Sequence, residues 1–457
     1  MPSRVYAASN AQILGLGSFK VFRVVESRLD RNPVPVSPEP VRARRLLPPT
    51  AAFAGSGAVF AALYVAAGAP TPLLVVFEQQ WHFPAWVLTV AFASYALGLL
   101  AALLVAGSLS DHIGRRPVLV GSLLVELGAM VMFVFAPDIG WLIAARTVQG
   151  IATGAATSAF SASVVEHAPE HHKKLGTIIT SIAPAGGLGL GALLTGIAVQ
   201  FSGHASVIVF TALAVIMAVG TGVAAFSAET VSTRPGAVRS LIPRVSVPKA
   251  ARREFAASIP VHMAAWMLAG LFMGLVPTII RDLLGLHSGL PNGATAFVEP
   301  AAAAMAGLFL GRLAARRTVF VGGTGVLLGT AVNMTGVATG TLPLLWVGGI
   351  IGGVGVGASF SGAIRTITPL VQPHQRAGLF ASVYLIAYLS FGVPAIIAGL
   401  LIAPVGLPAT VLGYGVAILV AAALGLLAQY RIHTHRSPME HTPPPRPSVS
   451  VEQWARK

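Results

Sequence analysis

The sequence predicts an all-α integral membrane protein with twelve transmembrane helices in two pseudo-symmetric six-helix bundles. Three observations lead to this prediction. The 457 residues are 55% hydrophobic and only 10% charged, with a mean hydropathy of +0.77, which is typical of a chain that crosses a membrane many times. The positive charges gather in alternate loops and at both ends of the chain. Finally, two segments of the second half repeat segments of the first half.

Composition divides the chain into five parts. They are an N-terminal cytoplasmic arm over residues 1–50, a first bundle over 51–228, a cytoplasmic linker over 229–255, a second bundle over 256–430 and a disordered cytoplasmic tail over 431–457. The arm lacks the apolar run and the cleavage site of a signal peptide, although residues 20–31 fit a short amphipathic helix. The tail is rich in Pro, His and Ser, which is typical of disorder.

Apolar runs of membrane-spanning length predict the helices one by one. In the first bundle they cover residues 51–77, 85–106, 118–136, 141–165, 175–201 and 205–228. In the second bundle they cover residues 256–280, 293–310, 319–338, 342–364, 377–403 and 408–430. The first helix contains Pro70 and Pro72, so we expect its outer end to be kinked or unwound.

The formal net charge of +15 does not indicate a nucleic-acid partner, because of where the charges lie. Of the 30 Lys and Arg residues, all except Arg146 and Arg281 fall in the arm, the tail, the linker and alternate loops. This positive-inside pattern predicts a multi-pass protein of the cell membrane, in bacteria the inner membrane, with both termini cytoplasmic. The partners we expect are the lipid bilayer, a small-molecule substrate and protons, with the chain acting as a monomer.

Four absences from the sequence limit the chemistry. There is no cysteine, so disulfides and thiolate metal sites are excluded. There is no Gly-Lys dipeptide and therefore no P-loop, so we expect no ATP-driven pumping by this chain. No intramembrane cluster of His, Asp and Glu has metal-ligand spacing, and no nucleophile lies beside a base. We expect no cofactor and no metal.

One short polar stretch between two apolar runs, residues 107–119, reads Gly-Ser-Leu-Ser-Asp-His-Ile-Gly-Arg-Arg-Pro-Val-Leu. It resembles the signature loop of the major facilitator superfamily. The matching positions are Gly107, Leu109, Asp111, Gly114, Arg115, Arg116 and Leu119. His112 stands where the family more often has Arg or Lys. The resemblance implies that this loop joins the second and third helices and latches the two halves of a transporter.

Arg146 lies inside the fourth predicted helix, where an unpaired charge is costly and is usually directed toward a cavity or a partner. Together with Gln149 and Gly150 it resembles the superfamily's helix-four motif, in which the arginine is tied to proton coupling. The alternative is an arginine that extends to the membrane interface, because Arg146 is only about five residues, on the order of 8 Å, from the end of its helix.

Three acids are candidates to balance Arg146 or to carry a proton. They are Glu78 after the first helix, Glu126 in the third and Glu299 in the eighth. In the superfamily, helices one, four, seven and ten line the cavity, two, five, eight and eleven flank it, and the remaining four support it. By that rule Glu299 is better placed than Glu126, and we favour Glu299 over Glu78 as the coupling acid. The alternative for Glu126 is a purely structural role, a hydrogen bond with a neighbouring helix. The alternative for Glu78 is a solvated loop acid.

The fifth predicted helix carries a proline followed by closely spaced glycines, Pro184, Gly186 and Gly187. The stretch resembles a degraded copy of the superfamily's antiporter motif, in which these residues act as a hinge. The alternative is that the small residues allow neighbouring helices to approach closely.

The repeat relates the two halves. Residues 311–317 read Gly-Arg-Leu-Ala-Ala-Arg-Arg, a degenerate copy of the signature loop displaced by 204 residues (311 − 107), in which Ala315 replaces the acid. Gly353 aligns with Gly150 at an offset of 203 (353 − 150). At the same offset Gly349 stands opposite Arg146. The symmetry of the scaffold therefore does not require an arginine at that position.

The functional prediction is secondary transport by alternating access, with proton-coupled efflux of a small amphipathic compound. Uptake of a small metabolite by proton symport is the alternative in the same class. A membrane-embedded enzyme and a channel are more distant alternatives; we predict that the chain is not an enzyme.

Overall fold

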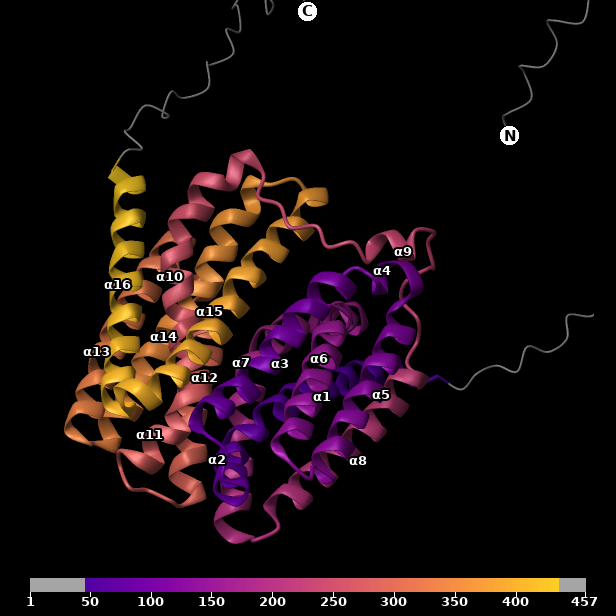
Figure 1. Cartoon of the computed structure of the whole chain (residues 1–457). Helices are drawn as coiled ribbons and strands as arrows, with labels where there is room; N and C mark the ends of the chain where they lie inside the picture. Colours follow the sequence, from indigo (N-terminus) through magenta and orange to yellow (C-terminus); the bar gives the residue numbers. More distant parts are fainter. Residues whose placement is uncertain (1–45, 435–457) are drawn as a thin grey trace, which may run out of the picture. The chain divides into compact units, whose positions relative to one another are not determined.

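The computed structural model describes residues 46–434, and these residues form helices joined by loops, with no strand among them (Figure 1). The first bundle contains α1 (Pro49–Gly68), α2 (Pro70–Trp81), α3 (Ala85–Ala106), α4 (Ser110–Ile113), α5 (Arg115–Val134), α6 (Ile139–His167), α7 (Lys173–Phe201) and α8 (Ala205–Phe226). The linker holds α9 (Ala237–Ser240). The second bundle contains α10 (Arg252–Gly270), the π-helical turn η4 (Leu271–Leu275), α11 (Val276–Asp282), α12 (Gly289–Phe309), α13 (Ala315–Thr339), α14 (Leu342–Ile367), α15 (Arg376–Val405) and α16 (Leu407–Thr434).

Eleven helical segments of the described residues are long and apolar enough to cross a membrane. α1 with α2 forms one of them, and α10 with η4 and α11 forms another. α6 lies outside this set although it has 29 residues, and its sequence contains Arg146, Gln149 and many Gly, Ser and Thr residues. The all-helical membrane fold is therefore confirmed, and the predicted count of twelve spans depends on α6.

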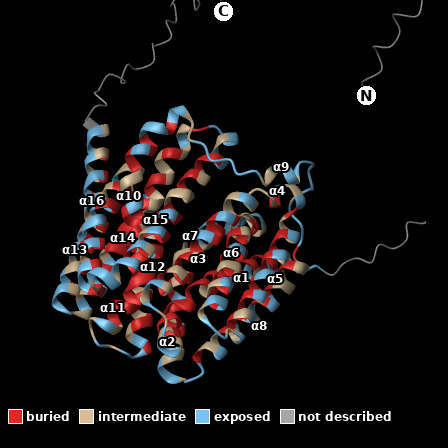
Figure 2. Ribbon diagram, in the orientation of Figure 1, coloured by how far each residue is buried: buried red, intermediate tan, exposed pale blue. Residues whose placement is uncertain are grey.

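The helices differ in how much of their surface other helices cover (Figure 2). The most hydrophobic window of the α1–α2 span is 78% buried and that of the α10–α11 span 83% buried. The corresponding windows of α8 and α16 are only 28% and 33% buried. Since all of these windows are apolar, α1–α2 and α10–α11 are central helices, whereas α8 and α16 present apolar surface to the outside, as lipid-facing helices do.

The two bundles contact each other through α7 against α12 and α3 against α15. Gly196 of α7 packs on the backbone of α12, where an added Cβ would lie 2.6 Å from Gly293 Cα. On the other interface the rings of Phe92 and Phe391 lie 4.8 Å apart, and Gly399 packs on Thr89. We call the ends of the helices near α4 and α9 the linker side and the opposite ends the far side. The glycine contacts lie on the far side, so the bundles meet closely there.

The internal repeat is present in the packing of the helices. An added Cβ on Gly150 of α6 would lie 2.2 Å from the carbonyl oxygen of Tyr95 in α3. An added Cβ on Gly353 of α14 would lie 2.3 Å from the carbonyl oxygen of Glu299 in α12. These glycines are aligned by the repeat, and Glu299 follows Tyr95 by 204 residues (299 − 95). Glu299 therefore occupies the position in the second bundle that Tyr95 occupies in the first.

The first span fits the prediction of a kinked or unwound outer end only in part. α1 ends at Gly68 and α2 begins at Pro70, but Ala69 between them keeps right-handed helical backbone angles, so the span is divided there without unwinding. A proline at the first position of a helical segment is tolerated because its missing N–H would have no intrahelical partner there. A further irregularity occurs in the seventh span, where η4 precedes Pro277. A π-helical turn accommodates a proline that would clash with the preceding turn.

The ends of the bundles also extend beyond the predicted limits. α1 begins at Pro49, inside the predicted arm, and α16 continues to Thr434, inside the predicted tail. The short helix predicted over residues 20–31 and the rest of the arm and tail lie outside the described residues.

The contact between α1 and α7 gives a stability prediction. An added Cβ on Gly191 would lie 2.0 Å from the carbonyl oxygen of Val65, so the two helices would have to separate. We expect Gly191→Ala to destabilise the detergent-purified protein by about 1–3 kcal/mol, the usual cost of overpacking. The measurement is the thermal unfolding midpoint. Gly121→Ala is the control, because nothing lies within 4 Å of its added Cβ; an equal midpoint for both variants would contradict this packing.

Candidate functional site

A cavity of about 410 Å³ lies between the two bundles. Its lining comes from α1, α3, α6 and α7 of the first bundle and from α10, η4, α12, α14 and α15 of the second. α5, α8, α13 and α16 contribute no lining residue. These four are the third, sixth, ninth and twelfth long helices, which the resemblance assigns to a supporting role. Pockets of roughly 300–1,000 Å³ bind small molecules, so the cavity is large enough for a substrate.

The cavity extends toward the linker side. Leu103 lies near the linker-side end of α3, and Gly307 and Arg365 lie near the corresponding ends of α12 and α14. No lining residue comes from α2 or α11, whose helices lie on the far side. Since the bundles pack through glycines on that far side, the cavity is closed there and extends in the opposite direction.

Glu299 lies in the wall of this cavity, on α12 immediately before Pro300. Its side chain is 1% exposed, and its Oε1 has no hydrogen-bond partner. Burying a carboxylate without a partner is costly, so such a group is a strong candidate to exchange protons or bind a cation. The structure thus places the acid that the sequence favoured in the central cavity.

Arg146 lies outside the lining, behind Tyr95, with its guanidinium carbon 4.4 Å from the centre of the Tyr95 ring. It is 2% exposed, so it does not extend to the membrane interface. Its Nη1 donates to the carbonyl of Ala67 at 3.1 Å and to Oε1 of Gln149 at 2.7 Å. The i, i+3 spacing places Arg146 and Gln149 on one face of α6, where the amide orients the arginine.

The acid associated with Arg146 is Glu126. Gln149 donates to Glu126 at 3.2 Å, and Thr153 donates to the other carboxylate oxygen at 3.5 Å. Of the three candidate acids, Glu126, and not Glu78 or Glu299, is therefore the one linked to Arg146, through Gln149. The physical reason is that α5 packs along α6 and directs Glu126 at its buried polar face. Glu126 is fully buried and accepts hydrogen bonds from a neighbouring helix. This agrees with the interpretation of Glu126 as a residue that hydrogen-bonds a neighbouring helix.

Glu78 forms a salt bridge between the two bundles on the far side. Its Oε2 lies 2.6 Å from Nη1 of Arg281, and the two side chains are only 10% and 11% exposed. Arg281 also contacts the carboxylate of Asp282 with a second pair of donors, Nη2 at 2.9 Å and Nε. The interpretation of Glu78 as a solvated loop acid is therefore wrong. Because α2 and α11 belong to different bundles, this salt bridge reinforces the closed far side.

Aromatic side chains form much of the cavity wall, and sequence reasoning missed them. Trp266 of α10 lies 5.2 Å from Tyr388, 5.9 Å from Phe391 and 6.1 Å from Phe360, measured between ring centres. Tyr384 lies 6.3 Å from Tyr388. Trp266 takes part in three of these four ring contacts. Its position on the seventh long helix, which the resemblance places at the cavity, was the available signal.

The signature loop binds the linker. Glu229 accepts the backbone N–H groups of Arg115 at 2.9 Å and Arg116 at 3.0 Å, and so caps the start of α5. Gly114 has φ +100°, and an added Cβ would lie 2.6 Å from the Glu229 carboxylate, so glycine is needed in this turn. Ser108 near the start of the loop donates to the carbonyl of Ser240 in α9 at 3.1 Å.

The acid of the loop has a local partner. Asp111 lies 2.5 Å from Arg115, whose guanidinium also reaches Glu166 of α6 at 3.3 Å. Among the described residues, these contacts join parts of the first bundle and the linker, and none of them reaches the second bundle. The expected latch between the halves is therefore not formed in this conformation. In the degenerate copy Arg316 lies 3.2 Å from Glu254 of α10.

The glycines of α7 support close packing. α7 is one continuous helix through Pro184, and an added Cβ on Gly187 would lie 2.7 Å from Tyr64 Cβ in α1. An added Cβ on Gly186 would lie 3.5 Å from Ala304 Cβ in α12, an ordinary contact distance. Pro184 itself lines the cavity. The packing interpretation is thus supported for Gly187, and a hinge at Pro184 stays a prediction.

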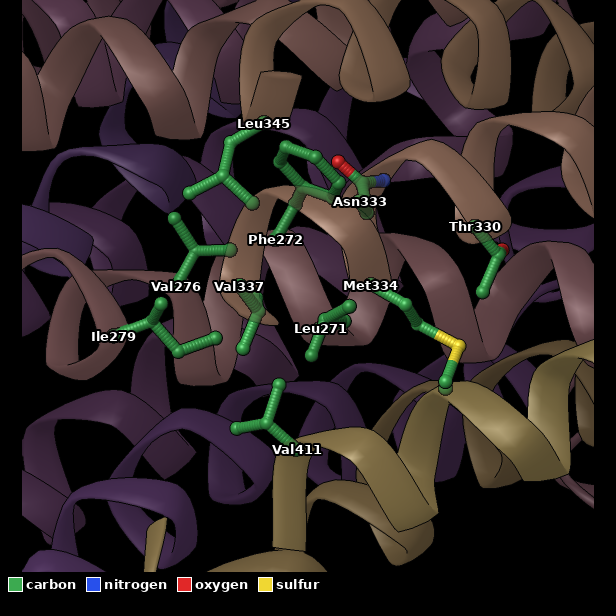
Figure 3. Close-up of a pocket in the computed structure, with 11 residues that line it drawn as sticks. Leu271, Phe272, Val276, Ile279, Thr330, Asn333, Met334, Val337, Leu345 and Val411 are labelled. Atoms are coloured by element: carbon green, nitrogen blue, oxygen red, sulfur yellow. The ribbon is translucent and has the colours of Figure 1, made fainter. Parts of the chain in front are cut away.

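A second cavity lies within the second bundle, among η4, α11, α13, α14 and α16 (Figure 3). It holds only about 10 Å³, which is about the space of one water molecule. Asn333 and Thr330 lie at its edge with side-chain polar atoms that have no protein partner. This cavity is too small for a substrate, so the larger cavity is the candidate transport site.

An all-helical membrane protein with a cavity between two related bundles has the architecture of an alternating-access transporter. A profile of the Major Facilitator Superfamily matches residues 55–332, and the chain belongs to this family. Family membership makes the chain a transporter and not an enzyme.

The proteins similar to this chain include a bacterial and a human transporter. The niacin transporter NiaP of Acinetobacter baylyi is 31% identical over 104 residues, which are 23% of this chain and 22% of that protein. The match thus spans about a fifth of the relative's length. The crystal structure of the human organic anion transporter MFSD10 (TETRAN) matches with a TM-score of 0.59 and 16% identity, covering 83% of this chain and 100% of that chain. At this identity the likeness shows the fold.

Proposed function

We propose that the chain exports a small amphipathic compound across the cell membrane in exchange for protons. The observation that carries this proposal is the cavity of about 410 Å³, which is lined from both bundles and contains Glu299 as a buried carboxyl without a partner at Oε1. The resemblance of the stretch around Pro184 to an antiporter motif supports export over uptake.

In the proposed cycle, residues 51–228 and 256–430 rock as two rigid halves joined by the linker 229–255. With the linker in the cytoplasm, the conformation described is inward-facing and is sealed outside by the Glu78–Arg281 salt bridge. A proton arriving at Glu299 competes with the substrate and biases the halves toward the other conformation. Reopening to the outside requires the far-side contacts to separate.

The test is transport by the purified chain in proteoliposomes with an imposed pH gradient. We expect flux of a compound identified by thermal-shift screening to follow the gradient, to saturate with concentration and to reverse direction when the gradient is reversed. Flux that does not respond to the gradient would contradict proton coupling. Flux that does not saturate would indicate a channel.

The proposed orientation gives a topology prediction. The linker carries six positive charges between Arg234 and Arg253, so both it and the two termini should be cytoplasmic. We expect reporter domains fused at positions 240 and 440 to be active only in a cytoplasmic form. A reporter at 285, in the loop between α11 and α12, is the control and should be external. An external reporter at 240 or 440 would refute the orientation.

The proposed function also gives a prediction for the signature loop. Asp111→Asn removes the exposed ion pair with Arg115, which is worth about 1 kcal/mol or less, so expression and folding should be retained. We expect a several-fold slower transport rate, because the carboxylate is also expected to latch the halves in the opposite conformation. Arg316→Ala, in the copy without an acid, should slow transport less. An equal or larger loss from Arg316→Ala would show that the second loop is the controlling one.

A further inference from the structure

The charges of the cavity wall are unevenly placed. Among the lining residues, Glu299 and Arg365 are the two with formal charge. Arg365 lies near the linker-side end of α14, where its Nη2 donates to the carbonyl of Leu313 at 2.7 Å. Glu299 packs opposite Gly353, and 12 residues of helix (365 − 353), roughly 18 Å, separate that level from Arg365. The deep part of the cavity therefore contains one negative group and no positive group.

Arg146, the basic residue of the first bundle near the depth of Glu299, does not add a positive charge to the deep part of the cavity. Arg146 is separated from the cavity by the ring of Tyr95 and is held by Gln149 and the Ala67 carbonyl. Glu126 already lies at the other end of this hydrogen-bond network. In the second bundle the position of Arg146 is taken by Gly349, against which Phe272 packs, so Glu299 has no arginine of its own.

Aromatic rings complete the site. Trp266, Phe360, Tyr388 and Phe391 form a connected group with ring centres 5.2–6.1 Å apart, and all four line the same cavity as Glu299. The faces of aromatic rings carry negative electrostatic potential and attract organic cations. A buried carboxyl together with several ring faces is the set of groups that recognises an ammonium ion bearing an apolar substituent.

From these three observations we infer that the substrate site of this transporter takes an organic monocation, whose charged nitrogen pairs with Glu299 and whose apolar part lies among the aromatic rings. This inference rests on the proposed function and names its substrate class. The bound cation compensates a carboxylate that otherwise lacks a partner at Oε1. In the deep part of the cavity an anion would instead face Glu299 with no positive group beside it, since Arg365 lies near the linker-side end. The chain would thus differ from the two similar proteins, whose names refer to niacin and to organic anions.

The experiment compares ligands of equal shape and different charge. Benzyltrimethylammonium and its uncharged carbon analogue neopentylbenzene differ only in the charged nitrogen, and nicotinate supplies the anion. Binding of each to the detergent-purified full chain is measured by calorimetry near pH 8. We expect the cation to bind at least tenfold more tightly than its neutral analogue, and nicotinate to bind more weakly than either.

Two variants test the site residues. Glu299→Gln should remove the preference for the cation over the neutral analogue, and Trp266→Leu should reduce it several-fold while keeping Glu299. Monodisperse elution and a retained thermal transition show that each variant is folded. Equal binding of cation and neutral analogue by the wild type, a preference unchanged in folded Glu299→Gln, or tighter binding of nicotinate would each overturn the inference. Gradient-driven flux of a neutral or anionic compound would overturn it while leaving the proposed function intact, whereas absence of any coupled flux would overturn the proposed function itself.

Discussion

Replacing Glu299 by glutamine is expected to uncouple transport from the proton gradient. In a one-for-one exchange, a gradient of one pH unit supplies about 1.4 kcal/mol and sustains about a tenfold concentration ratio of substrate. The wild-type chain should approach that ratio in proteoliposomes, and Glu299→Gln should reach a ratio of about one. Because glutamine keeps the size of the side chain, downhill exchange at saturating substrate should continue in the variant and should lose its dependence on pH.

Glu78→Gln is the matched control for this result. It removes the same charge from an acid that is already bound to Arg281 and lies outside the cavity. We expect this variant to change the rate, since it weakens the far-side closure, and to keep the pH dependence. Wild-type pH dependence in Glu299→Gln would remove Glu299 as the coupling acid. Loss of pH dependence only in Glu78→Gln would transfer that role to the far-side salt bridge.

The position of Glu299 at the cavity could be predicted because it depended on the order of the helices. A carboxyl in the eighth apolar run lies on a helix that flanks the cavity in the family the chain resembles, and the structure places it in the cavity wall. The repeat adds a relation that could be calculated from the numbering: Glu299 stands where Tyr95 stands in the first bundle. Both facts follow from the spacing along the chain, so a single sequence contains them.

The partners of the charged residues could not be predicted in the same way. The contact of Arg146 with Gln149 is local, whereas the link to Glu126 depends on the rotation of α5 against α6. The pairing of Glu78 with Arg281 joins residues 203 positions apart in different bundles. Spacing within a helix gives the face on which a side chain lies, but it does not give the neighbour that this face meets.

The linker shows the same limit. Its charge predicted a cytoplasmic segment, yet Glu229, one of its few acids, is the residue that binds the signature loop. A carboxylate at the start of a helix is favourable wherever backbone N–H groups are free. The sequence contained both the helix start at Arg115 and the acid, but their contact depends on the packing of α8 against α5, which brings Glu229, just after α8, to the start of α5.

Replacing Arg146 by alanine is expected to abolish gradient-driven transport. The guanidinium is 2% exposed and is shared between Gln149, the Ala67 carbonyl and the face of Tyr95. Its removal leaves Glu126 in the interior without a nearby positive charge. It also leaves Gln149 Oε1 and the Ala67 carbonyl without their buried donor, and each such loss costs about 1–3 kcal/mol. We therefore expect lower thermal stability together with the loss of transport.

A double variant separates folding from coupling. Arg146→Ala with Glu126→Gln removes both charges of the network, so the stability cost should be partly reversed, while Glu126→Gln alone serves as the control for the acid. Thermal unfolding and gradient-driven flux are measured on all three variants. If Arg146 takes part in the conformational change through Tyr95, the double variant should be stable and still fail to couple transport to the gradient. Recovery of coupled flux along with stability would show instead that Arg146 only neutralises Glu126. Proton coupling would then depend on Glu299 and not on Arg146.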